Sequence, residues 1–207
     1  MLGVVRANDL DDAIRIQNDS EFGLTGGIHS LDDRETTIWK DRVEVGNGYV
    51  NRPITGAIVQ RQPFGGWKRS YFGPGAKAGG PNYVAQFATW KNVVLPVKAA
   101  ESDNPLLQKL QAALPAERDA LAAFARSDAF WKNKEFDVEH DPSGLACEAN
   151  VFRYRKFRRV MVRIDAELGD LDAARLILTA EATRTPYELS CGNRRDWMAG
   201  LGIEILV

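Results

Sequence analysis

Cysteine is scarce in this chain. The 207 residues include only Cys147 and Cys191, which are too few for a disulfide framework and suit a reducing compartment. We therefore expect both to behave first as small buried hydrophobic residues. Long apolar runs are also missing, because no stretch approaches the roughly 20 consecutive apolar residues that a membrane helix needs. The first residues turn acidic where a signal peptide would continue apolar, so we expect a cytoplasmic protein.

Acidic residues are absent from one long part of the chain. Residues 1–44 hold ten acidic side chains against five Lys or Arg, whereas residues 45–100 hold no acid, seven basic residues and nine of the 18 glycines. Such a stretch produces a positive local potential, which favours an anionic ligand or an acidic neighbouring subunit. The alternative is chance clustering on a solvated face. With 44% hydrophobic and 27% charged residues, the chain is expected to fold rather than to be disordered or fibrous.

Apolar runs and capping residues predict alternating strands and helices near the start of the chain. The expected strands are residues 2–5, 23–30 and 48–51, and the helices between them have cap candidates at Asn8 or Asp9 and at Asp32 or Asp33. This alternation implies parallel pairing, with ligand-binding loops at the carboxyl ends of the strands. The loop that follows, residues 51–81, is rich in glycine and proline and is therefore expected to line a site.

Residues 83–94 interleave aromatic and polar side chains, among them Tyr83, Phe87 and Trp90. This pattern predicts an edge strand or a hairpin. Because an exposed strand edge needs a partner, we expect this segment to pair with another chain, as in a homo-oligomer.

The composition changes beyond Pro96 and predicts a second α/β unit. Two short amphipathic helices are expected over residues 106–124, split at Pro115, and an alanine-rich helix from Asp170 or Asp172 to about Ala182. Further strands are expected at residues 150–155, 160–164, 187–190 and 202–207. The arginines of residues 153–163 could also form a nucleic-acid surface, but acidic residues balance them nearby and the net charge is −1. The prediction is thus an α/β protein with a first domain at residues 1–100 and a smaller one at 101–207.

The most informative run is TGAIVQRQPFGG, residues 55–66. Gly56 lets backbone amides face a ligand at close range, and consecutive N–H groups in a turn form a nest for a carboxylate or another anion. Phe64 offers an aromatic wall. On these residues alone, a generic glycine-rich turn is as good an explanation as a binding loop.

The order of several motifs carries a resemblance to a known family. The series GLTGGIHS, YVNR, TGAIV, PFGG and GGPNY resembles the C-terminal part of the catalytic domain of L-glutamate γ-semialdehyde (pyrroline-5-carboxylate) dehydrogenases, in the aldehyde dehydrogenase superfamily. It is similar in particular to the dehydrogenase module of bacterial proline utilization A, and it covers roughly residues 2–94. The resemblance implies that backbone N–H groups of Gly56 and Ala57 hold the substrate's α-carboxylate, and that Phe64 flanks its aliphatic stem.

A weaker resemblance concerns residues 140–155, which look similar to the extra C-terminal domain of long proline utilization A proteins. That domain is implied to cover the substrate tunnel without binding NAD. We therefore expect residues 101–207 to serve as a cover in the parent protein.

The family implies chemistry that this chain does not show. It oxidises the semialdehyde to glutamate with NAD, using a cysteine nucleophile, a glutamate that activates water and an NAD-binding domain. These all precede the resembling region in relatives, so we expect a fragment that is inactive alone and binds no NAD itself. The resemblance gives Cys147 and Cys191 no catalytic role. His29 and His140 have no partners at metal-ligand spacing, so we expect no metal site.

Two other interpretations stay open at this point. The chain could be a non-enzymatic module that pairs with a full-length dehydrogenase through residues 83–90, or a fragment of an aldehyde dehydrogenase with another substrate. The run from Gly73 to Gly79 mimics a dinucleotide fingerprint, but its glycine spacing is wrong and no strand precedes it. We expect that run to be a loop.

Overall fold

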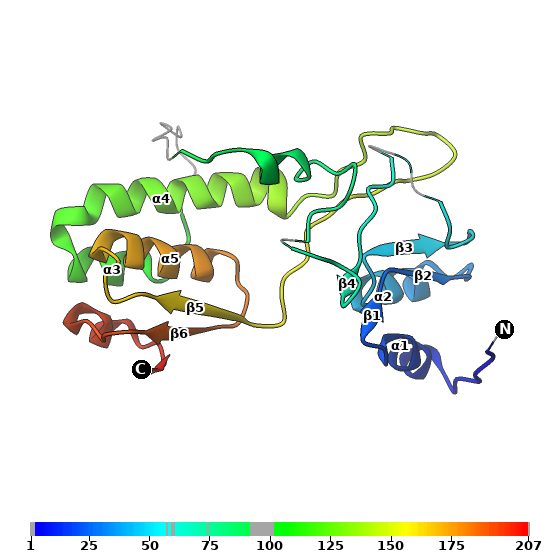
Figure 1. The fold of residues 1–207 in the computed structure, drawn as a ribbon, viewed down its shortest axis with the longest axis horizontal. Helices are drawn as coiled ribbons and strands as arrows, with labels where there is room; N and C mark the ends of the chain where they lie inside the picture. The colour runs from blue at the N-terminus through cyan, green and yellow to red at the C-terminus, as the bar shows by residue number, and fades with distance from the viewer. Residues whose placement is uncertain (1–2, 57, 59–60, 74, 92–101, 207) are drawn as a thin grey trace. The chain divides into compact units, whose positions relative to one another are not determined.

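The protein is described by a computed structural model that covers residues 3–56, 58, 61–73, 75–91 and 102–206. Its contacts divide the chain into two compact units. The first unit holds residues 1–91 together with residues 140–152, and the second holds residues 92–139 and 153–207. The domain division at residue 100 stays a prediction. Figure 1 shows the helices and strands of each unit.

Two capped helices flank the first unit's central strands. Helix α1 spans Leu10–Asn18 and helix α2 spans Asp33–Arg42. The carboxylates of Asp9 and Asp32 each accept a backbone N–H of the first turn at 2.8 Å, so these are the caps among the predicted candidates. A cap of this kind contributes about 1 kcal/mol to helix stability.

Strands β2 (Thr25–Ile28) and β3 (Asn47–Val50) form a parallel pair, which confirms the predicted strand–helix–strand order. Ile14, Trp39 and Val43 make up the buried core of this unit. The short strands β1 (Phe22–Gly23) and β4 (Trp67–Lys68) pair antiparallel. No strand forms over residues 3–5, where Val4 and Val5 are exposed and have no described strand beside them. That part of the strand prediction is wrong.

The predicted edge strand at residues 83–94 is also wrong where the structure describes it. Residues Val84–Phe87 form a short 3-10 helix, η1. The N–H of Ala88 donates to the carbonyl of Ala85 at 3.2 Å, so the backbone here satisfies its hydrogen bonds locally. Residues 92–94 lie outside the described residues.

The second unit is a three-stranded parallel sheet with helices. The sheet order is β5-β6-β7, from strands Val160–Ile164, Tyr187–Cys191 and Ile205–Leu206. The long helices are α3 (Leu107–Ala113), α4 (Arg118–Trp131) and α5 (Asp170–Ala182). Short helical segments are η2 (Pro115–Glu117), η3 (Lys132–Phe136) and η4 (Asp196–Leu201). The split at Pro115 and the extent of α5 match the prediction. Helix α5 packs against β5, and α4 packs against α5 (Figure 1).

The core of the second unit consists of buried apolar residues. Leu189 from the sheet and Ile177 and Leu178 from α5 are fully buried. Cys191 is buried too, with its Sγ 3.8 Å from the Sδ of Met198, as expected for a small hydrophobic residue. None of the helices within the described ranges is long and apolar enough to span a membrane.

Two predictions for residues 147–155 are corrected by the structure. Cys147 is exposed, not buried. Residues 150–155 form no strand, because only Phe152 makes an isolated bridge, with His140. Arg153 instead pairs with Glu139, Nη1 to Oε1 at 3.3 Å, so this arginine is neutralised by an ion pair rather than presented on a strand face.

Candidate functional site

The loop after β3 places Gly56 at the surface. Its φ of +96° is one that L side chains rarely adopt, and an added Cβ would meet no atom within 4 Å. A glycine is therefore required by the backbone and not by crowding. The Gly56 carbonyl accepts a hydrogen bond from the Tyr49 hydroxyl at 2.8 Å, and no described residue engages its N–H. Ala57, the second predicted anchor residue, lies outside the described residues.

The amide of Gln62 gives the Gly56 carbonyl a second donor. In one orientation its nitrogen donates to Asn150 Oδ1 at 3.3 Å. In the other, its nitrogen donates to the Gly56 carbonyl at 3.0 Å and its oxygen accepts from Arg52 Nη1 at 2.9 Å. The second orientation makes two shorter hydrogen bonds, so we assign it. Gly56 is thus held through its carbonyl from two sides.

Phe64, the predicted aromatic wall, is half-buried in a loop that is tied to β3. Phe64 and Ala78 exchange two backbone hydrogen bonds of 2.9 Å. On either side of Phe64, Asn47 donates to the Pro63 carbonyl at 2.9 Å and accepts from the Gly65 N–H at 3.1 Å. The first residue of β3 therefore fixes the backbone that carries the Phe64 ring.

Lys77 reinforces the same loop. Its ammonium group donates to the carbonyls of Gly46 at 2.6 Å and Gly65 at 2.5 Å, and to Asn47 Oδ1 at 3.3 Å. Burial lowers the pKa of Lys77 to about 8. The two glycine segments approach so closely that a Cβ on Gly46 would lie 1.9 Å from the Gly65 oxygen. The lysine thus joins backbone segments that only glycine allows to touch.

Most cations of the acid-free stretch have acidic partners elsewhere in the same unit. Lys68 pairs with Glu44, Arg69 with Glu21, and both Arg52 and Arg61 with Glu148. The Arg61 hydrogen bond, followed by that from Asn150, holds the pKa of Glu148 below its ordinary value of 4.5. The positive potential expected from the sequence is therefore largely compensated. An anionic ligand at Gly56 would have to be held mainly by backbone N–H groups.

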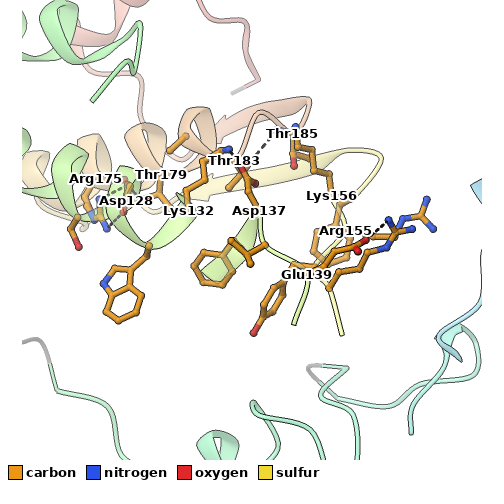
Figure 2. A pocket seen from close by; sticks show the side chains of 18 residues that line it. Asp128, Lys132, Asp137, Glu139, Arg155, Lys156, Arg175, Thr179, Thr183 and Thr185 are labelled. Carbon is orange, nitrogen blue, oxygen red and sulfur yellow. Dashed lines mark hydrogen bonds and ion pairs between the residues drawn. The ribbon is translucent and has the colours of Figure 1, made fainter. Parts of the chain in front are cut away.

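A separate pocket of about 710 Å3 lies within the second unit. It is lined by the end of α4, by residues that follow α4, by residues 153–157 and by the last turns of α5. Figure 2 shows Arg175 and Asp128 joined by dashed lines on one side of it, with Glu139 and Arg155 at the other. The ion pairs Arg175–Asp128, Lys132–Asp137 and Arg153–Glu139 neutralise most of its charged lining. Sequence reasoning missed this pocket because it assigned residues 150–155 to a strand.

The Gly73–Gly79 loop does not fit a dinucleotide, and the described residues offer no cluster of metal ligands. The loop from Gly73 to Gly79 is followed by the short η1 and not by an α-helix. A pyrophosphate would therefore find no helix N-terminus there. No group of three His, Cys, Asp or Glu side chains within the described ranges could hold a metal ion.

Comparisons with known proteins agree with this arrangement. Residues 1–93 match the model of the aldehyde dehydrogenase family. A 1-pyrroline-5-carboxylate dehydrogenase of Staphylococcus aureus is 40% identical over 93 residues, which is 45% of this chain and 18% of the relative. The structure of proline utilization A from Corynebacterium freiburgense matches with a TM-score of 0.79 and 41% identity, over 100% of this chain and 22% of that chain.

These matches concern mainly the first unit. Residues 1–93 are similar to a segment of the aldehyde dehydrogenase family model. The whole chain has the α/β fold of the corresponding part of proline utilization A, which extends the likeness into the second unit. The chain spans about a fifth of the length of each of these relatives.

Proposed function

We propose that this chain contributes the substrate-carboxylate site of an NAD-dependent L-glutamate γ-semialdehyde dehydrogenase. The family match and the relatives' names support the reaction class. The observation that carries the proposal is the Gly56 turn, which is exposed and requires glycine. The Tyr49 hydroxyl holds this turn by donating to the Gly56 carbonyl. The Gly56 carbonyl is engaged by Tyr49 and Gln62, and the Gly56 N–H, which no described residue engages, is the donor that this turn offers to a ligand.

The proposed site holds one end of the substrate and leaves the reacting end free. Backbone N–H groups at Gly56 and Ala57 bind the α-carboxylate, as anions bind in backbone nests. Phe64 packs against the methylene groups that separate the carboxylate from the aldehyde. Holding the carboxylate fixes the aldehyde's position, which lowers the entropic cost of the reaction step.

This chain supplies no nucleophile in the proposal. Cys147 lies outside the segment that matches the family and Cys191 is buried against Met198, so we assign catalysis to neither. When bound in the whole enzyme, NAD accepts the hydride from the substrate. We assign the residues of this chain no contact with NAD. Purified alone, the chain should form no NADH from pyrroline-5-carboxylate and NAD, and sustained NADH formation would overturn this assignment.

Binding of a matched pair of ligands tests the carboxylate site. L-proline resembles the cyclic form of the substrate, and L-prolinamide differs from it only in replacing the carboxylate by a neutral amide. Calorimetry of the full chain should show binding of L-proline and at least about tenfold weaker binding of L-prolinamide, since the amide brings no negative charge to the backbone donors. Gly56→Val should abolish the difference. Equal affinity of the unmodified chain for both ligands would refute a carboxylate nest.

We also propose that the segment around η1 contacts another subunit in a cytoplasmic homo-oligomer. Phe87 and Trp90 are 76% and 78% exposed, so a large apolar surface is available for a partner. Light scattering should show an oligomer that Phe87→Ser weakens. As a control, Phe72→Ser removes a fully exposed ring outside the segment and should leave the oligomer intact. A monomeric parent enzyme at micromolar concentration would rule out this assembly.

A further inference from the structure

Residues 140–152 form a closed loop within the first unit. His140 and Phe152 exchange backbone hydrogen bonds of 2.9 and 2.7 Å at its base. Inside the loop, the Asp141 carboxylate accepts the N–H of Ser143 at 3.0 Å and that of Asn150 at 2.8 Å. These bonds fix the loop from within, so Glu148 near its end is presented in a defined place.

Glu148 receives donors from three side chains. Its Oε1 accepts from Arg61 Nε at 2.7 Å and from Asn150 Nδ2 at 3.1 Å, and its Oε2 accepts from Arg52 Nη1 at 3.1 Å. The Nε of Arg52 is buried and has no hydrogen-bond partner among the described residues. The Arg52 guanidinium is therefore partly desolvated, and losing its carboxylate would leave a poorly compensated charge.

Arg52 in turn touches both groups that hold Gly56. Its Nη1 donates to the Gln62 oxygen at 2.9 Å, and its guanidinium lies over the Tyr49 ring, 5.7 Å from the centroid. Gln62 and Tyr49 are the two donors to the Gly56 carbonyl. A continuous chain of contacts therefore runs from Glu148 through Arg52 to the Gly56 peptide.

We propose that Glu148 is a positioning residue for the Gly56 turn, so that a loop distant in sequence sets the geometry of the carboxylate site. Glu148 does not touch the substrate in this proposal. It fixes Arg52 and Arg61, and Arg52 keeps Gln62 and Tyr49 aligned on the Gly56 carbonyl. The effect on substrate binding rests on the proposed function, whereas the effect on the Gly56 turn does not.

Amide NMR of the full chain tests the positioning directly. Glu148→Gln removes the charge but keeps the size of the side chain. The Gly56 N–H signal should then shift, because the turn loses its alignment, and the Arg61 Nε–H signal should move, because its charged acceptor is gone. Glu139→Gln is the matched control, since it removes the same charge from a carboxylate that pairs with Arg153 in the other unit. It should change neither signal.

Two results would overturn the proposal. The first is an unchanged Gly56 N–H signal position in a folded Glu148→Gln chain. If Glu148→Gln instead unfolds the unit, Arg52→Gln becomes decisive, because it breaks the same chain of contacts one step closer to Gly56. A signal shift confined to the Gly56 turn in that variant supports the proposal, and unchanged signal positions overturn it.

The ligand measurement separates this proposal from the proposed function. Glu148→Gln should weaken L-proline binding roughly threefold to tenfold, as expected for the loss of one aligned hydrogen bond, and Glu139→Gln should leave it unchanged. If the unmodified chain binds no L-proline, the proposed function fails, while the position of the Gly56 N–H signal still decides the role of Glu148. If L-proline binds equally to both variants, Glu148 does not position the carboxylate site.

Discussion

Replacing Gly46 by alanine should strongly destabilise the first unit. A Cβ at this position would lie 1.9 Å from the Gly65 oxygen and 2.6 Å from the Gly66 Cα. These neighbours are backbone atoms, and Lys77 and Asn47 hold them in place, so no flexible side chain can move aside. Overpacking of well-ordered sites costs about 1–3 kcal/mol, and contacts this short with backbone place Gly46→Ala at the upper end, about 3 kcal/mol.

The indole signal of Trp39 provides the assay, because Trp39 is buried in the first unit and donates from Nε1 to Gln17 at 2.7 Å. Followed in urea by NMR, its unfolding midpoint should fall by roughly 1–2 M, given a slope of about 2 kcal/mol per molar for a small unit. Gly3→Ala is the control, since a Cβ there meets no atom within 4 Å. Midpoints that agree within error for the two variants would refute the close approach of Gly46 and Gly65.

Three further predictions concern single side chains. The pKa of Lys77 is lowered from 10.5 to about 8 on folding, so the unfolded state binds more protons between these two pH values. The urea midpoint followed by Trp39 should therefore rise from pH 8 to pH 10.5, and this rise should be absent in Lys77→Met. Tyr49→Phe removes the 2.8 Å hydrogen bond to Gly56 and should weaken L-proline binding about fivefold in calorimetry. Unchanged affinity would mean that this hydrogen bond does not contribute to ligand binding. Leu189→Ala should lower the unfolding free energy of the second unit by about 2–5 kcal/mol, because Leu189 is fully buried there. The urea midpoint followed by Trp39 in the first unit should stay unaltered.

Local sequence signals predicted the capped helices and the paired strands, but not the segments that lack a neighbouring strand. The helix caps Asp9 and Asp32 could be predicted because a carboxylate residue followed by apolar residues at helical spacing is a local pattern. The strands at β2 and β3 and the helix α5 are likewise visible as apolar runs with clear ends. The Gly56 turn was predicted from its glycine and its family motif, and its positive φ agrees.

Long-range contacts were not predictable from local patterns. Glu148 lies 96 residues from Arg52, and one glutamate in an irregular segment gives no periodic signal. The same holds for the residues 140–152, whose contacts place them with the first unit. The edge-strand prediction for residues 83–91 was wrong for another reason. Alternation of aromatic and polar residues does not show whether a neighbouring strand exists to pair with.

A chimeric enzyme tests most directly whether this chain carries the substrate-carboxylate site of a semialdehyde dehydrogenase. The matching part of proline utilization A from Corynebacterium freiburgense, 22% of that chain, would be replaced by residues 1–207. We predict NADH formation that saturates with pyrroline-5-carboxylate, and a KM that Gly56→Val raises about tenfold or more with a smaller change in kcat. An active chimera whose KM is the same with Gly56 and with valine would contradict the proposed site.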